Sequence, residues 1–78
     1  MALELFERAV LLRDIPDAGL REGDVGTVVE RYCDESGNVS GYELEFFSAA
    51  GDTLAVESVS ADAVREPTSS DHLAIRLA

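Results

Sequence analysis

The amino-acid sequence predicts a mainly β protein, a small barrel of four to six short strands with one short helical turn. Apolar residues recur at every second position in several segments, which is typical of strands that bury one face. Links rich in glycine, aspartate and serine separate these segments at intervals of about eight to twelve residues. The chain has 78 residues, a length that favours a single domain, residues 1–78, with a modest core.

The first predicted element is an extended segment from about residue 7 to residue 15. The stretch ALELFERAVLL (residues 2–12) consists of good helix formers, and a helix with one apolar side is the alternative. The extended segment runs up to Pro16, and the segments that follow alternate like strands. We therefore favour a strand, followed by a long first loop, DAGLREGD (17–24).

The phrase GDVGTVVERY (residues 23–32) predicts a turn that leads into a strand. Gly23 and Gly26 allow the chain to turn tightly or to bulge where a side chain would clash. The Asp24 carboxylate is expected to accept hydrogen bonds from nearby main-chain groups. Val25 and Val29 are predicted to enter the core.

Two further segments alternate with a period of two. YELEFF (residues 42–47) is expected to bury its apolar face and to turn its two glutamates outward. TLAVESV (residues 53–59) repeats the pattern, with Leu54 and Val56 predicted to point inward. The predicted buried face of the first segment comprises Tyr42, Leu44 and Phe46.

The links between these segments have turn-forming compositions. DESGNVSG (residues 34–41) is rich in residues that tolerate left-handed backbone or bond their own main chain. SAAGD (48–52) indicates a hairpin loop. SADAVRE (60–66) predicts one helical turn, with Ser60 as its cap and Pro67 as its end. Bent strands, a long first loop and a late single turn give an SH3-like order.

The C-terminal residues 68–78 are predicted to form a strand or arm. HLAIRLA (residues 72–78) alternates, with Leu73, Ile75 and Leu77 on one side. Such a strand needs a sheet edge to pair with. We expect it to pair either within the barrel or with a second copy of the chain, and the second alternative would make the protein a homo-oligomer.

The charge of the chain limits its partners. Sixteen acidic residues stand against six basic ones, all arginine, which gives a formal net charge of −10. Such a surface repels nucleic-acid phosphates and anionic membranes, and it favours a basic protein as partner. The lone cysteine, Cys33, and the lack of a signal peptide or a long apolar run predict a cytoplasmic protein.

Four glutamates are the candidate partner-binding site. Strand alternation is expected to place them on one outer face of three neighbouring strands, and they are Glu30, Glu43, Glu45 and Glu57. We interpret this face as a surface that recruits a basic protein. The alternative interpretation is a solvated sheet surface that serves only solubility.

No pattern in the sequence indicates catalysis, so we predict that the protein is not an enzyme. One histidine and one cysteine supply no metal cluster, and neither a metal nor another cofactor is expected. A nucleophilic pair of Cys33 and His72 is conceivable. Their positions, before a turn-rich link and in the C-terminal arm, give no reason to bring them together.

The segment GDVGTVV (residues 23–29) resembles the loop-and-strand phrase of KOW motifs, which occur in ribosomal and transcription-factor barrels. The resemblance implies a nucleic-acid-binding barrel as an alternative function. In RNA-binding barrels such a loop needs basic or aromatic neighbours. Here two arginines, Arg21 and Arg31, stand among three acidic residues, which makes a poor phosphate site. An accessory subunit of an enzyme is the third alternative.

A longer resemblance covers nearly the whole chain. Residues 4–32 (ELFERAVLLRDIPDAGLREGDVGTVVERY), 41–66 (GYELEFFSAAGDTLAVESVSADAVRE) and 72–77 (HLAIRL) are similar to a bacterial family, domain of unknown function 4926 (DUF4926). The resemblance implies a compact SH3-like barrel. Members often neighbour another small gene in arrangements that look like toxin–antitoxin pairs. The resemblance therefore implies an antitoxin- or immunity-like role beside a basic partner.

Overall fold

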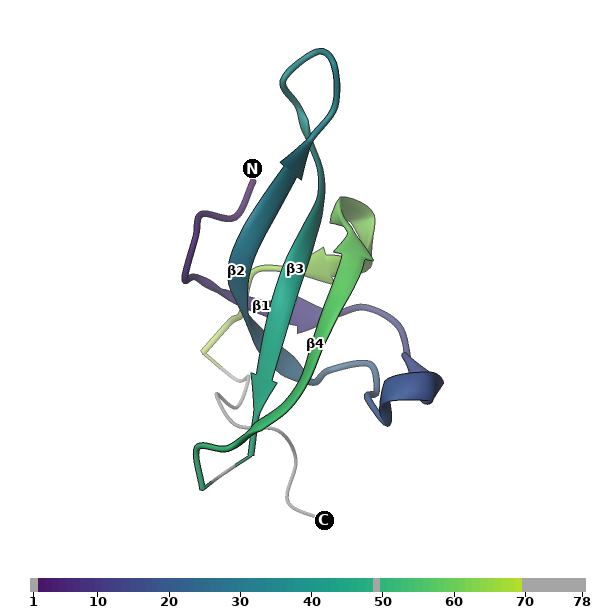
Figure 1. The fold of residues 1–78 in the computed structure, drawn as a ribbon, viewed down its shortest axis with the longest axis vertical. Coiled ribbons are helices and arrows are strands. Elements are labelled where there is room, and N and C mark those ends of the chain that lie inside the picture. Colours follow the sequence, from purple (N-terminus) through teal and green to yellow (C-terminus); the bar gives the residue numbers. More distant parts are fainter. Residues whose placement is uncertain (1, 49, 70–78) are drawn as a thin grey trace.

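The computed structural model describes residues 2–48 and 50–69 and shows a curled half-barrel of five antiparallel strands (Figure 1). The strands follow the order β4-β3-β2-β1-β5 across the sheet. Two single-turn 3-10 helices, η1 (Pro16–Ala18) and η2 (Ala61–Ala63), lie between strands. The strands are β1 (Arg8–Leu11), β2 (Val25–Cys33), β3 (Val39–Phe47), β4 (Thr53–Ser60) and β5 (Val64–Arg65).

This architecture confirms the predicted fold class, with a short helical turn late in the chain and a second one in the first loop. The N-terminal stretch forms a strand and not a helix, as favoured from the sequence. The strand is shorter than predicted, because β1 ends at Leu11. Beyond it Pro16 begins η1, and Ile15 pairs with Leu20 in an isolated bridge.

The strands β2, β3 and β4 form an antiparallel meander, and they run side by side in Figure 1. The strand β1 crosses at a steep angle to this meander and pairs with the start of β2. It also pairs with β5, which follows the turn η2. The bent sheet thereby encloses a core between the meander and β1.

The core confirms the alternation predicted for the third strand. Leu44 and Phe46 have no exposed surface, and Tyr42 is 3 % exposed. Gly26 lies against the Phe46 ring, where a Cβ atom would approach ring carbons to 2.8 Å. The N-terminal segment closes one side of the core, and the backbone N–H of buried Leu3 donates a 2.9 Å hydrogen bond to the Tyr42 hydroxyl.

A β-bulge in β2 corrects one core prediction. Val28 lies opposite Leu44 and Glu30 lies opposite Glu43, so Val29 is the extra residue between them. Val28 is consequently the residue without exposed surface, whereas Val29 is half-buried. Val25 is buried, as predicted.

A second register shift, between β3 and β4, inverts the predicted faces of the fourth strand. Phe47 lies opposite Thr53 and Phe46 lies opposite Ala55, which leaves Leu54 as the extra residue. The predicted inward orientation of Leu54 and Val56 is therefore wrong, since their exposed fractions are 54 % and 46 %. A shift of one residue moves every following side chain to the other face of a strand.

The phrase that begins at Gly23 forms the predicted turn. Gly23 has φ +92°, a left-handed conformation that glycine adopts without steric cost. Asp24 is 5 % exposed, and its Oδ2 accepts a 2.9 Å hydrogen bond from the backbone N–H of Arg21. Gly26 meets a different requirement, the close approach of Phe46. These contacts give the phrase a complete structural explanation.

The predicted helical turn at residues 60–66 is shorter in the structure. Ser60 is at the N-cap position, but its hydroxyl donates to Asp62 Oδ1 at 2.7 Å and does not cap the backbone. The turn ends at Ala63 because Val64 and Arg65 pair with β1 as the strand β5. The predicted strand at residues 72–78, with Leu73, Ile75 and Leu77, lies outside the described residues.

Candidate functional site

Three of the four predicted glutamates share the outer face of the meander. Glu30 of β2 lies directly opposite Glu43 of β3. Glu45 follows two positions along β3, opposite Thr27, and therefore points the same way as Glu43. Glu30 is exposed, and the other two are half-buried. We call Glu30, Glu43 and Glu45 the acidic face.

Glu57 does not belong to the acidic face. It lies opposite Leu44, which has no exposed surface, so its side chain is on the inner side of the sheet. The predicted grouping of four glutamates is wrong at this position, because the register shift at Leu54 reverses the faces of β4. Glu57 is half-buried there.

The hydrogen-bond donors to the acidic face are side-chain hydroxyls and one backbone N–H, that of Arg31, which donates to Glu30 Oε1 at 3.1 Å. The Tyr32 hydroxyl donates to Glu43 Oε1 at 2.7 Å, and Ser58 Oγ lies 3.4 Å from the same oxygen. Thr53 Oγ1 donates to Glu45 Oε2 at 2.7 Å. The ion pairs Arg13–Asp62 and Arg31–Glu4 do not involve these glutamates.

Tyr32 lies beside the acidic face and was not among the site residues predicted from the sequence. It follows Glu30 by two positions on β2, so strand alternation alone would have placed both side chains on one face. The hydrogen bond to Glu43 raises the pKa of Tyr32, and desolvation and the nearby negative charges of Glu43 and Glu30 add to this effect. Ser58 acts in the opposite direction.

The arginine beside this face points elsewhere. Arg31 lies opposite Tyr42, on the inner side of the sheet. Its Nη1 atom lies 3.1 Å from Glu4 Oε1 in the N-terminal segment. The guanidinium group of Arg31 is therefore not part of the acidic face. Its ion pair with Glu4 holds the N-terminal segment against the inner side of the sheet.

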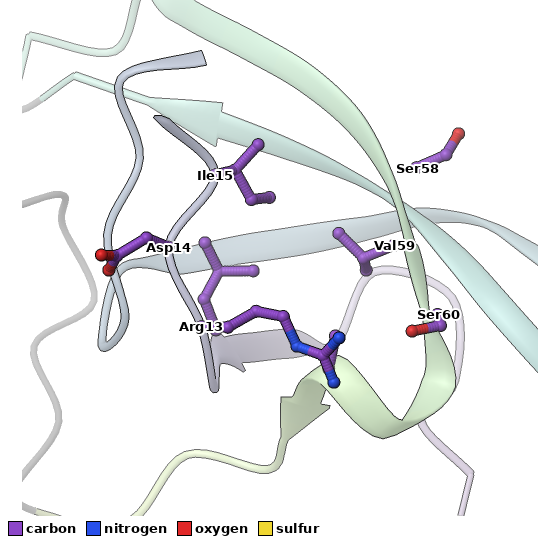
Figure 2. Close-up of a pocket in the computed structure, with 8 residues that line it drawn as sticks. Arg13, Asp14, Ile15, Ser58, Val59 and Ser60 are labelled. Carbon is purple, nitrogen blue, oxygen red and sulfur yellow. The ribbon is translucent and has the colours of Figure 1, made fainter. Parts of the chain in front are cut away.

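A pocket of about 220 Å³ lies between the segment that joins β1 to η1 and the end of β4 (Figure 2). Ile15 of this segment and Val59 of β4 form part of its apolar lining, and Arg13 extends toward Ser60. The Ser58 side chain points away from the pocket. The inner side of β4 is thus open at this end.

The strand order and the 3-10 turn before the last strand define a small, mainly β protein whose five antiparallel strands form a curled half-barrel. The family model described as "Domain of unknown function (DUF4926)" matches residues 5–66. The chain therefore belongs to the DUF4926 family, as its sequence resemblance implied. No curated protein and no solved structure matches the chain significantly.

Within residues 2–48 and 50–69, no helix has the length and apolarity needed to cross a membrane. In the same part of the chain, no three His, Cys, Asp or Glu side chains are grouped to hold a metal ion.

Proposed function

We propose that this protein is a non-catalytic protein-binding module, and that its acidic face recruits a basic protein in the cytoplasm. The observation that supports this most directly is the pairing of Glu30 with Glu43. Two carboxylates directly opposite each other on neighbouring strands repel, and such pairs destabilise a sheet. A lysine or arginine from a partner would relieve this repulsion.

The charge of the whole chain supports the same proposal. A formal net charge of −10 accelerates association with a positively charged partner and slows the approach of an anionic one. The role of an antitoxin- or immunity-like partner is consistent with this charge and with the gene arrangements that the family resemblance implies. The acidic face would then bind the basic protein directly.

Paired charge variants test this proposal. The protein, tagged at its N-terminus, is used to capture partners from extracts of its native cell, and association with the captured partner is then measured at several salt concentrations. We expect the double variant Glu43→Gln, Glu45→Gln to associate several-fold more slowly and with a weaker salt dependence. The sheet should remain folded, because glutamine has nearly the size of glutamate and its side-chain oxygen can still accept the hydrogen bonds from Tyr32 and Thr53.

The matched control is the double variant Asp17→Asn, Glu22→Gln. It removes the same two charges from exposed positions in the first loop. We expect it to associate nearly as fast as the unchanged protein. Equal slowing in both double variants would assign the effect to net charge alone. Captured RNA that binds the protein in a filter assay at low salt would favour the nucleic-acid alternative.

A further inference from the structure

The strand β4 is an edge strand with one side unpaired. In the described part of the chain it pairs only with β3, at one end of the sheet order. It is eight residues long. An edge of this kind presents backbone N–H and C=O groups that a further strand can bond.

The first half of this edge exposes two aliphatic side chains, whereas Ser58 and Ser60 follow on the same outer face. Leu54 and Val56 are 54 % and 46 % exposed, whereas Thr53 at the start of the strand is hydrogen-bonded to Glu45. Exposed aliphatic side chains beside unpaired backbone favour the addition of a strand whose own aliphatic side chains would cover them.

The inner face of the same edge has a charge. Glu57 is half-buried on that side, and no cation or hydrogen-bond donor contacts its carboxylate among the described residues. A partly buried carboxylate disfavours an aliphatic neighbour and favours a basic one.

We propose that the β4 edge accepts an extended strand of the basic partner. This strand places aliphatic side chains beside Leu54 and Val56 on the outer face and a lysine or arginine beside Glu57 on the inner face. The inference rests on the proposed function and adds the way in which the partner binds. The acidic face attracts the basic strand, and the β4 edge aligns it.

Charge selects this occupant over a second copy of the chain. Two copies, each with a formal net charge of −10, repel each other. A basic strand is attracted by both the acidic face and Glu57. An inward-pointing charge on an edge strand is also a device that prevents unselective pairing with apolar strands.

Two synthetic peptides of equal composition test the proposal. Both are eight residues long, acetylated and amidated; in one, lysine alternates with valine, and in the other, four valines precede four lysines. Affinity is measured by fluorescence anisotropy at about 0.15 M salt, and amide hydrogen exchange is measured along β4. We expect the alternating peptide to bind about tenfold more tightly and to slow exchange at β4.

Single substitutions locate the contact. Glu57→Gln should weaken binding of the alternating peptide by roughly two- to fivefold, the effect of one cross-strand charge pair, and should leave the block peptide unaffected. Val56→Lys should weaken binding of the alternating peptide more than Glu57→Gln does, because the new lysine has the same positive charge as the peptide and lies on the docking edge. Circular dichroism of each variant checks that the sheet is folded.

Equal affinity for the two peptides, or unchanged exchange at β4, would overturn the inference. If the double variant Glu43→Gln, Glu45→Gln then bound both peptides more weakly, the proposed recruitment of a basic protein would stand, but binding would not occur by strand addition. Slow amide hydrogen exchange along β4 in the protein without peptide would also overturn the inference. If this slow exchange depended on protein concentration, a second copy of the chain would be the occupant. If it were lost when residues 70–78 are deleted, the occupant would be the chain's own C-terminus.

Discussion

The ring of Phe46 occupies the space beside Gly26 in which a side chain would begin. A Cβ atom built on Gly26 would lie 2.8 Å from Cε2 and 2.9 Å from Cζ of Phe46. Phe46 has no exposed surface, so its ring has little freedom to move away. The glycine of the loop phrase thus serves the packing of a residue twenty positions later.

This relationship predicts that Gly26→Ala destabilises the protein. We expect a loss of about 1–3 kcal/mol in the free energy of unfolding, the usual cost of overpacking a core, measured by urea denaturation. Combining Gly26→Ala with Phe46→Leu should cost less than the sum of the two single changes, because the smaller side chain relieves the clash. Strictly additive values would contradict the close contact.

The hydroxyl of Tyr42 predicts a second stability effect. It accepts the hydrogen bond from the buried backbone N–H of Leu3. Tyr42→Phe leaves this N–H without its acceptor, and we expect a cost of about 1–3 kcal/mol. Tyr32→Phe is the matched control, because Tyr32 is exposed, and it should change stability by less than about 0.5 kcal/mol. Thermal unfolding of both variants would show equal shifts if the buried bond were unimportant.

Tyr32 is expected to titrate above the ordinary tyrosine range. Its hydrogen bond to Glu43 and the surrounding carboxylates disfavour the phenolate and raise its pKa. Because the pKa is raised in the folded state, the stabilisation is complete below the unfolded value of about 10 and decreases as pH rises through the folded pKa. Ultraviolet absorbance of the phenolate measures this titration, and loss of one titration step in Tyr32→Phe identifies the residue.

Changing Glu43 should move the same titration. We expect Glu43→Gln to lower the pKa of Tyr32 toward its ordinary value, because the charged acceptor and its negative potential are both removed. An unchanged titration in this variant would contradict the hydrogen bond between the two side chains.

The repulsion between Glu30 and Glu43 predicts a stabilising substitution. Glu30→Gln removes one of two charges directly opposed across neighbouring strands. We expect a gain of about 0.2–1 kcal/mol at low salt, which should shrink as salt screens the pair. Glu35→Gln, in the exposed link after β2, removes one charge without a strand partner. A larger gain for Glu35→Gln would assign the effect to net charge.

Local patterns in the amino-acid sequence predict the strands of the meander and the turn at Gly23. The alternation of YELEFF placed Tyr42, Leu44 and Phe46 in the core, because one face of the strand is apolar throughout. The glycines and aspartate of GDVG determined a turn by local backbone chemistry. The acidic face was predictable to the same extent, since Glu43 and Glu45 follow from alternation within one strand.

The faces of β4 and the position of Glu57 depend on long-range packing. With a simple register, Leu54 and Val56 would have faced inward and Glu57 would have lain opposite Glu43. Leu54 is instead the extra residue, so small Ala55 lies opposite the buried Phe46. Strand alternation has a period of two, and one extra residue reverses every face that follows it. Local sequence does not encode that choice, because it depends on the packing of the Phe46 ring between neighbouring strands.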